Sequence, residues 1–377
     1  MYLVYLCLQP PIFFQMIENS EQLLNIACEF QIEGKAVVIR PLGEGFINDT
    51  YSVYVDENKE PSYILQRKNH IIFPDVPAMM DNISRVTEHI RKKCVNPHRS
   101  TLTIIPAKDG KLYFKDAEGN FWAVCSFIGG SKSYEKADSP ELAYQGGLGL
   151  GVFHRQVSDF KEPLAEVIKG FHNISFRFQQ WDEAIAADRA GRVASLSEEI
   201  GWIESRRTVM TEFREKYENG TFPMRVTHND TKISNFLFDA ADGSLLCAID
   251  LDTMMSGTLL NDVGDALRSY TNTGAEDDND LDNVNMSMEM FKAYIIGYMS
   301  QMKDSLTPSE IEALAFSGIY ITYEQVLRFL MDYINGDTYY KIKYPQHNLV
   351  RARAQYKLLQ SMESQLDQMN EFVRSIR

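Results

Sequence analysis

The stretch VTHNDTKISNFLFD, Val226–Asp239, sets several polar side chains between apolar residues, and the run CAIDLD follows it with two further carboxylates. In chain order, the polar positions include Asp230, Lys232, Asn235 and Asp250. Carboxylates in apolar surroundings cost free energy unless a metal or a partner neutralises them. The pattern therefore predicts a functional site. The alternative interpretation is a surface loop followed by a strand with solvated acids.

Phosphoryl transfer is the chemistry that these four residue types suit. It requires positioning and charge neutralisation more than covalent help. One carboxylate must orient the acceptor hydroxyl and take its proton, while a lysine offsets the charge on the migrating group. An amide oxygen and a second carboxylate can hold Mg²⁺, which prefers oxygen ligands and keeps positions for water and phosphates. Asp230, Lys232, Asn235 and Asp250 match these four tasks in that order.

Neighbouring polar residues allow more than one role. His228 could act as a base, but a structural hydrogen-bonding role is favoured, and zinc is disfavoured because no second His or Cys lies at ligand spacing. The alternation of CAIDLD predicts a strand with Asp250 and Asp252 on one face, which makes Asp252 a second metal ligand or a hydrogen-bond acceptor. Asp262 and Asp265 are expected to brace the catalytic loop.

Length and composition limit the class of protein. A chain of 377 residues exceeds what one hydrophobic core usually organises, so we expect two lobes. The formal charge of −14 argues against a nucleic-acid partner, because a nucleic-acid footprint needs clustered Lys and Arg. The scattered cysteines indicate neither a disulfide framework nor a structural zinc site and fit a reducing cytoplasm.

The first residues form an apolar segment, MYLVYLCLQPPIFFQM. It lacks a basic lead-in and a small-residue cleavage site, and it is too short to span a bilayer. We expect residues 1–16 to be an N-terminal extension, with Met16 as a possible functional start. A lipoprotein or export signal is the alternative. We expect a cytoplasmic protein with no membrane partner.

The pattern changes once along the chain. Residues 17–128 read as a β-rich lobe, with hairpins around Asp109-Gly110 and around Asp116 to Asn120 and one helix over DVPAMMDNISRVTEHIRKKC. Residues 129–138 read as a hinge. Ser139 can cap a helix that has Pro140 at its first position, and residues 139–377 are mainly helical. The fold class predicted is α+β.

Two glycine-rich segments could approach a phosphate. In PLGEGFINDTYSV, Gly43 and Gly45 lie at a turn directly before a strand, where backbone N–H groups can approach an anion; an ordinary hairpin turn is the alternative. GGLGLGVFHRQ lacks the G-x-G-x-x-G spacing, and its glycines are expected to serve close helix packing.

The ordered motifs resemble a known family. HNDTKISN followed by IDLD is similar to the aminoglycoside phosphotransferase and choline kinase group, which has a two-lobe, protein-kinase-like fold with a small antiparallel β-rich N-lobe and a larger helical C-lobe. The resemblance sharpens towards the N-acetylhexosamine 1-kinases through ILQRKNHIIFPDV, ISRVTEHIRK, CAIDLDTMMSGTLLNDVGDALR, RFLMDYINGDTYYK and HNLVRARAQ. These segments run from about Leu42 to about Gln355, most of the chain.

The resemblance implies transfer of the ATP γ-phosphoryl group to the anomeric hydroxyl of GlcNAc or GalNAc. It makes Asp230 the catalytic base, with Lys232 beside it, and makes Asn235 and Asp250 the Mg²⁺ ligands. Gly43 and Gly45 would lie over the phosphates, and AVCSFIGG would supply the backbone that holds adenine.

The resemblance also leaves alternatives open. The small-lobe cation of kinases has no clear lysine here; Arg67, paired with Glu88, is the candidate, and Gln66 is the rival. Arg328 is a candidate sugar contact, while its spacing to Asp332 also suits a helical ion pair. The tyrosines of GDTYYK could stack on a sugar or simply pack.

Other functions remain possible from the sequence. The acceptor could be an aminoglycoside, homoserine, methylthioribose or choline, or the chain could be a catalytically silent kinase-like binding protein. We expect ATP and a small-molecule sugar as partners. The oligomeric state stays open, and a monomer is compatible with the sequence.

Overall fold

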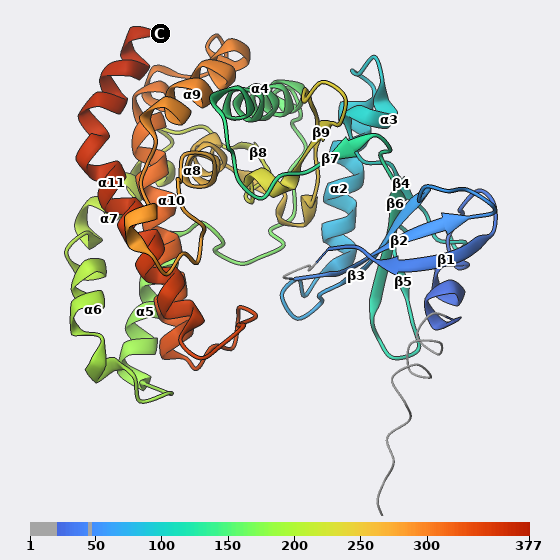
Figure 1. Ribbon diagram of the computed structural model, residues 1–377, viewed down its shortest axis with the longest axis horizontal. Helices are drawn as coiled ribbons and strands as arrows, with labels where there is room; N and C mark the ends of the chain where they lie inside the picture. The colour runs from blue at the N-terminus through green and yellow to red at the C-terminus, as the bar shows by residue number, and fades with distance from the viewer. Residues whose placement is uncertain (1–20, 44–46) are drawn as a thin grey trace, which may run out of the picture. The chain divides into compact units, whose positions relative to one another are not determined.

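A computed structural model describes residues 21–43 and 47–377. The predicted extension, residues 1–16, and Gly45 lie outside these residues. The chain divides into two compact units (Figure 1). Of the described residues, the first unit contains 21–43, 47–81 and Leu102–Gly129, and the second contains Asn82–Thr101 and Gly130–Arg377. The predicted limits of the lobes and the hinge stay predictions.

The first unit is built on a six-stranded antiparallel sheet in the order β1-β2-β3-β6-β4, with β5 beside β6. Alternating apolar residues make one face of it a core: Val53, Leu65 and Val124 are almost fully buried and pack with Ile26 and Ala27. The strands are β1 Ala36–Pro41, β2 Asp49–Val55, β3 Tyr63–Lys68, β4 Ile104–Ile105, β5 Phe114–Lys115 and β6 Phe121–Ser126.

One of the two predicted hairpins is confirmed. β5 and β6 pair across the turn that Asp116 to Asn120 form. The other prediction, a hairpin around Asp109-Gly110, was wrong about which strands pair. β4 pairs with β6 and not with the segment directly after β4. Asp109-Gly110 does form a turn, in which Ala107 N–H donates to the Lys111 carbonyl at 2.7 Å. Its second arm does not continue as a partner of β4.

The predicted helix is α2, Val76–Arg91, and its apolar stripe of Met79, Ile83, Val86 and Ile90 is buried. Asn82 lies in the part of α2 that belongs to the second unit. Its side-chain amide donates to the carbonyls of Ala165 at 2.9 Å and Met254 at 3.0 Å.

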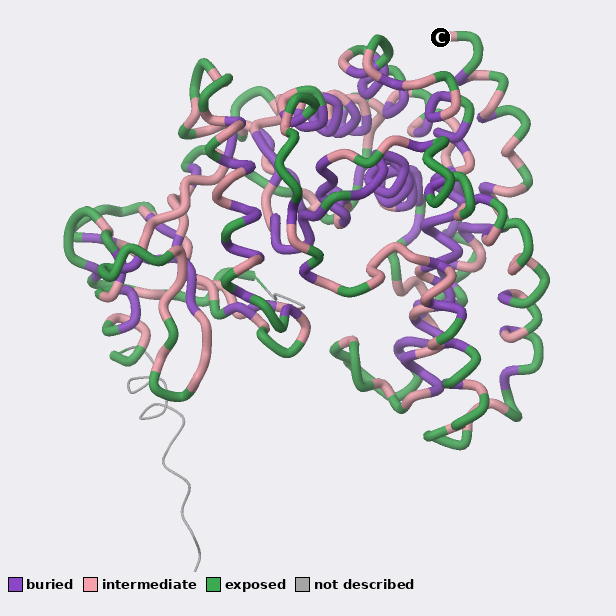
Figure 2. The backbone as a smooth tube through the Cα atoms, turned by 180° about the vertical axis from the view of Figure 1, so that it is seen from behind, coloured by how far each residue is buried: buried purple, intermediate pink, exposed green. Residues whose placement is uncertain are grey.

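The second unit is mainly helical, which confirms the predicted α+β class. Its centre is formed by α8, whose residues are nearly all buried, and α10, most of whose residues are buried (Figure 2). The helices are α3 Pro97–Ser100, α4 Pro140–Val157, α5 Ile174–Ala187, α6 Ser197–Glu204, α7 Arg207–Glu218, α8 Leu259–Tyr270, α9 Met288–Met302, α10 Pro308–Ile334 and α11 His347–Ser375, with short 3₁₀ turns η1 Val193–Ser195, η2 Ile233–Asn235, η3 Leu251–Thr253 and η4 Leu281–Asn283.

Helix α4 begins as predicted and explains its glycines. The Ser139 hydroxyl accepts the N–H of Leu142, and Pro140 occupies the first turn. α4 packs on α9. A Cβ on Gly147 would lie 2.0 Å from the carbonyl oxygen of Tyr294, so only glycine permits this approach. For Gly147, the prediction of close packing against a backbone is confirmed.

Short strands of the second unit hold the polar motif. β8 Arg225–Thr227 pairs with β11 Met255–Gly257, and β9 Phe236–Asp239 lies between β7 Ser131–Lys132 and β10 Leu245–Ala248. The predicted strand over CAIDLD was wrong at its end. β10 stops at Ala248 and Asp250 takes a left-handed backbone with φ of 55°. The turn separates Asp250 from Asp252, which is buried at the start of η3.

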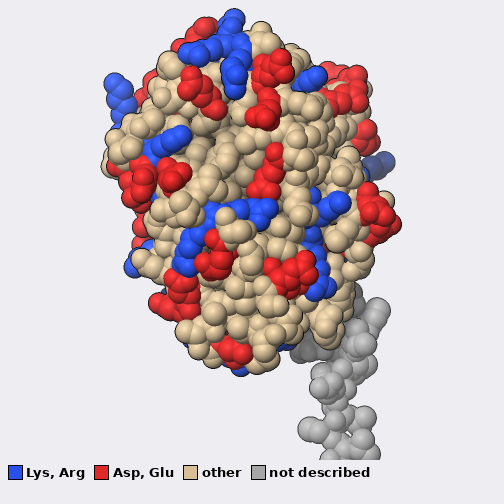
Figure 3. Space-filling view, turned by 90° about the vertical axis from the view of Figure 1, so that its left-hand side faces the viewer, with Lys and Arg blue, Asp and Glu red and all other residues tan. Residues whose placement is uncertain are grey.

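The face formed by α6, α7 and α11 mixes both charge signs (Figure 3). Ion pairs lie on it, such as Arg206–Glu363 and Arg207–Asp182, each with 2.6 Å between nitrogen and oxygen. In the described part of the chain, no helix is long and apolar enough to cross a membrane.

Candidate active site

The loop after β8 is held by one buried carboxylate on α8. Asp262 accepts the backbone N–H groups of His228 at 2.8 Å and Asn229 at 2.7 Å, and its side chain is fully buried. His154 on α4 also hydrogen-bonds to Asp262, at 2.8 Å. The predicted bracing role of Asp262 is therefore confirmed. Asp265, in contrast, pairs with Arg268 on its own helix at 2.9 Å.

Asn229 carries the bend that presents the next residue, Asp230. Its φ of 65° is uncommon for a residue with a side chain. Its side chain accepts the Thr227 hydroxyl at 3.0 Å and donates to the Thr253 carbonyl at 2.9 Å. This network over-determines the bend, as expected where a strained residue serves a site.

Asp230 has two polar neighbours from its own loop. Asn235 Nδ2 donates to Asp230 Oδ2 at 2.7 Å, and Lys232 Nζ lies 3.2 Å from the same oxygen. The side chains of Lys232 and Asp230 are 32% and 24% exposed, so both can reach a ligand. Partial burial opposes the charge of Asp230, but the cation of Lys232 and these hydrogen bonds outweigh it and lower the pKa of its carboxyl group. Asp230 is therefore a carboxylate at neutral pH.

Lys232 is held as a cation by the same cluster. Burial alone would lower the pKa of its ammonium group, but the carboxylates of Asp230 and Asp250 outweigh burial and raise it. This charge relationship also places Asp250 near Lys232. The structure thus brings Asp250 close to Lys232 and Asp230, which lie some 20 residues earlier in the sequence.

Asn235 and Asp250 form a donor set that fits Mg²⁺. The Ile249 N–H donates to the Asn235 carbonyl at 2.9 Å, which sets Asp250 beside Asn235. Both hydrogen bonds that Asn235 Nδ2 donates go to Asp230, so the amide oxygen Oδ1 is turned away from that residue. An amide oxygen and a carboxylate are hard oxygen donors of the kind that Mg²⁺ takes from proteins.

His228 has the structural role that the sequence favoured. Its Nε2 lies 2.9 Å from the Ile249 carbonyl, so this nitrogen carries the proton. Its Nδ1 accepts the Asp230 N–H at 3.3 Å. The residue is fully buried. It fixes the loop and does not present a base to a ligand.

The candidate nucleotide-binding residues Gly43, Arg67 and Glu88 lie in the first unit and on α2, each in different surroundings. Gly43 is exposed, with φ of 71°, a turn conformation that favours glycine. Arg67 is exposed and pairs with Asp49 on the adjacent strand, its Nε donating at 2.8 Å. Glu88 on α2 is exposed and accepts the Ser84 hydroxyl at 3.4 Å. The pairing of Arg67 with Glu88 stays a prediction.

The sequence interpretation passed over Lys68. This last residue of β3 is only 4% exposed, and its Nζ donates to Gln66 Oε1 at 2.7 Å. Gln66 donates in turn to the Thr50 hydroxyl at 3.2 Å. The signal was available, because residues 66 and 68 share one face of a strand and residue 67 lies on the other.

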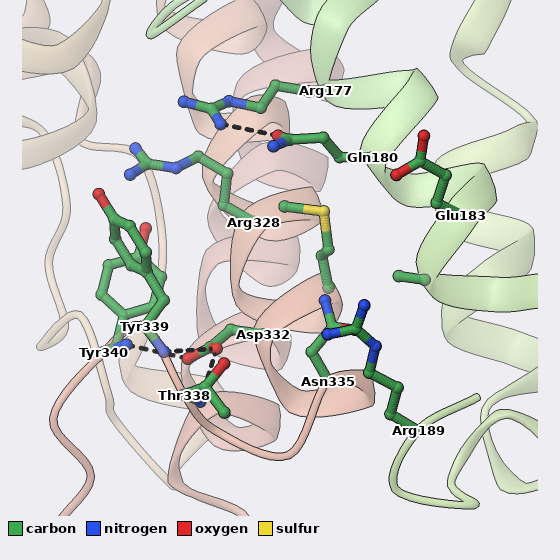
Figure 4. A pocket seen from close by; sticks show the side chains of 12 residues that line it. Arg177, Gln180, Glu183, Arg189, Arg328, Asp332, Asn335, Thr338, Tyr339 and Tyr340 are labelled. Atoms are coloured by element: carbon green, nitrogen blue, oxygen red, sulfur yellow. Dashed lines mark hydrogen bonds between the residues drawn. The ribbon is translucent and has the colours of Figure 1, made fainter. Parts of the chain in front are cut away.

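Arg328 lines a cavity of about 290 Å³ between α5, α10 and the loop after α10 (Figure 4). Its guanidinium lies 5.6 Å from the ring centre of Tyr340 and 5.7 Å from that of Tyr339, and Arg177 of α5 lines the same cavity. Burial opposes the charge of Arg328, but the neighbouring tyrosines and Glu324 raise its pKa, so it is a cation.

The ion pair suggested by the spacing of Arg328 and Asp332 does not form. Arg328 donates to Gln325 at 3.4 Å. Asp332 accepts the backbone N–H groups of Thr338, Tyr339 and Tyr340 at 2.8–3.0 Å. A carboxylate surrounded by N–H donors has no need of a cation. Asp332 therefore holds the loop that carries both tyrosines, and the guanidinium of Arg328 lines the cavity without pairing with Asp332.

The chain is similar to known proteins in sequence and in fold. A family model described as the phosphotransferase enzyme family matches residues 38–285. The fold is similar to that of a microcompartment-associated aminopropanol kinase, with a TM-score of 0.65 and 17% identity over 93% of this chain and 98% of that one. It is also similar to that of a spectinomycin phosphotransferase, with a TM-score of 0.57 and 13% identity over 93% of this chain and 98% of that one. For an ethanolamine kinase of Plasmodium vivax, the TM-score is 0.51 and the identity 14%, over 88% of this chain and 84% of that one.

Proposed function

The chain belongs to the phosphotransferase enzyme family, and from this premise we propose that it is an ATP- and Mg²⁺-dependent kinase of a small molecule, most specifically an N-acetylhexosamine 1-kinase. The observation that carries the proposal is the contact of Asp230 with Asn235 and Lys232. It joins a base, a metal-ligand candidate and a cation in one loop, which is what phosphoryl transfer requires.

In the proposed mechanism, Asp230 orients the acceptor. Its carboxylate accepts a hydrogen bond from the acceptor hydroxyl and takes the proton as the oxygen attacks the γ-phosphorus. Lys232 is close enough to offset charge on the transferred group. The buried network around Asp262 keeps the loop in this geometry without reorganisation.

ATP and its metal are assigned to the remaining candidates. Asn235 and Asp250 would hold Mg²⁺, which would neutralise charge on the nucleotide phosphates. Gly43 lies in a turn that lets backbone N–H groups approach a phosphate. We assign the role of the small-lobe cation to Lys68 in preference to Arg67, because Lys68 is buried on β3 while Arg67 is exposed and occupied by Asp49.

The cavity at Arg328 supports a neutral, compact acceptor. Its volume of about 290 Å³ lies at the lower end of the range for small-ligand sites, roughly 300–1,000 Å³, and suits a monosaccharide better than a multi-ring aminoglycoside. Tyr339 and Tyr340 offer aromatic surface and hydroxyls to a sugar. The guanidinium groups of Arg177 and Arg328 disfavour a cationic acceptor such as choline.

Identification of the product tests the proposal. With ATP, Mg²⁺ and GlcNAc or GalNAc, phosphorus NMR should show a sugar phosphate whose phosphorus couples to the anomeric proton. A product phosphorylated at another hydroxyl would keep the kinase and remove the 1-kinase assignment. Binding of ATP with Mg²⁺ without any turnover would favour the silent binding protein. A cytoplasmic location stays a prediction, and the oligomeric state stays open.

A further inference from the structure

His172 joins the catalytic loop to α10. It lies just before α5, where its Nε2 is 3.1 Å from the carbonyl oxygen of Asn229 and its Nδ1 is 2.9 Å from Glu324 Oε2. The His172 and Glu324 side chains are 7% and 1% exposed. The contact to Asn229 is therefore made one residue before the proposed base, away from bulk water.

The partners of His172 fix its charge. A carbonyl oxygen and a carboxylate oxygen are both acceptors, so each ring nitrogen must donate a proton, and the ring is an imidazolium. The alternative, a neutral ring facing protonated Glu324, is disfavoured because Arg177 Nε lies 3.5 Å from the other Glu324 oxygen and stabilises the carboxylate. Burial opposes the ion pair, yet the Glu324 charge and hydrogen bond raise the pKa of His172.

A second histidine holds the other end of the same peptide group. The Asp230 N–H donates to His228 Nδ1 at 3.3 Å, while the carbonyl of the same peptide, that of Asn229, faces His172. His228 accepts through Nδ1 and contacts the Ile249 carbonyl through Nε2, whereas both ring nitrogens of His172 face acceptors. The peptide that leads into Asp230 is thus held between one accepting and one donating imidazole.

We propose that His172 is a positioning residue of the kinase: as a buried imidazolium held by Glu324, it fixes the Asn229–Asp230 peptide and so the direction of the Asp230 carboxylate. The inference rests on the proposed function for its kinetic consequence, though not for the charge state. Glu324 and Arg328 lie one helical turn apart on α10, so the carboxylate that holds His172 also interacts with the cation that lines the proposed acceptor cavity.

The expected dependence on pH follows from the charged groups around the ring. Glu324 and Arg328 face the His172 ring from α10, and Arg177 lies beside Glu324. His172 also borders a cavity of about 340 Å³, which Glu166 and Arg214 line. The pKa of His172 is raised above its ordinary value, so the doubly donating ring is present at low and neutral pH and is lost as pH rises through the folded-state pKa. Turnover should therefore fall on the alkaline side, with little change in the KM for ATP.

Nuclear magnetic resonance tests the charge and the contact without turnover. In the full chain, the His172 ring carbon between its two nitrogens should titrate above about pH 6.5, the ordinary value for histidine. The Asp230 amide should shift with the same midpoint. In Glu324→Gln, the midpoint should move to lower pH. A His172 midpoint at or below the ordinary value would overturn the proposal, even if the chain proves to be a kinase. An Asp230 amide resonance that does not shift as His172 titrates would overturn it as well.

Rates measured against pH test the positioning. His172→Gln keeps one N–H donor but cannot carry the charge, so kcat should fall on the order of 10- to 100-fold and lose its alkaline decline. His89→Gln removes a surface histidine that pairs with Asp159 at 2.8 Å and is the matched control. An alkaline decline that persists in His172→Gln would contradict the positioning role. Absence of turnover on every acceptor would reject the proposed function, and the resonance result would still decide the inference.

Discussion

Asn235 donates from a single amide nitrogen to both the carbonyl oxygen and the carboxylate oxygen of Asp230, at 2.9 and 2.7 Å. The proposed base and one proposed metal ligand are therefore held together before any ligand binds. Such pre-organisation lowers the cost of assembling a site for phosphoryl transfer. It also means that a substitution at Asn235 would disturb Asp230, so Asp250 is the better position for testing the metal site alone.

Asp250→Ala should weaken nucleotide binding only where Mg²⁺ takes part. The variant removes a proposed metal ligand and should lower the affinity for ATP with Mg²⁺ on the order of tenfold or more, since tenfold corresponds to only ~1.4 kcal/mol. Calorimetric titrations with Mg²⁺ and with a chelator check this. Asp242→Asn, a solvent-exposed carboxylate that accepts the Ser244 N–H in a turn, is the control. Equal loss of affinity in the two titrations would remove Asp250 from the metal site.

Arg328→Lys should raise the acceptor KM. Lysine keeps the charge but has neither the planar fork nor the face that lies against Phe171, Tyr339 and Tyr340. Loss of this arrangement should lower kcat/KM for the acceptor several-fold to about 30-fold and leave the KM for ATP unchanged. Arg206→Lys is the control, because Arg206 also lies over a tyrosine, 5.1 Å from the ring of Tyr356. An unchanged acceptor KM would exclude Arg328 from the acceptor site.

Gly147→Ala should destabilise the second unit. The new Cβ would overlap the Tyr294 carbonyl, so α4 and α9 must separate, at a cost of about 1–3 kcal/mol in the free energy of unfolding. Gly201→Ala in α6 is the matched control: its Cβ meets no atom within 4 Å, and it should stabilise by about 0.5–1 kcal/mol. Urea denaturation measures both. Similar values for the two variants would contradict the packing role of Gly147.

Much of the proposed catalytic loop could be predicted because its residues are close in sequence. Asp230, Lys232 and Asn235 lie within one short segment, and their spacing alone indicated their proximity. The helices were equally readable from apolar periodicity, as the buried stripe of α2 shows. The direction of a side chain near the end of a strand was harder to predict. The alternation of apolar residues suggested a strand through Asp250, but the left-handed backbone of Asp250 ends the strand before it.

Contacts between distant segments could not be read from the sequence. His172 and Glu324 are 152 positions apart, and nothing local marks either residue as a partner of the catalytic loop. Asp332 was paired with Arg328 on helical spacing, but it binds N–H groups of a loop whose path the sequence does not specify. Contacts that depend on the packing of α5 against α10 can be identified only from the structure.

The most direct test of the account is ATP consumption with Mg²⁺ over a panel of GlcNAc, GalNAc, glucose, galactose, homoserine, choline and an aminoglycoside, with Asp230→Asn alongside. We expect turnover confined to the N-acetylhexosamines and a loss on the order of 10²–10⁴ in kcat for the variant. The variant should keep the fold, as checked by its unfolding midpoint. Near-parental activity of Asp230→Asn would contradict the assigned base, and turnover confined to choline or the aminoglycoside would contradict the acceptor.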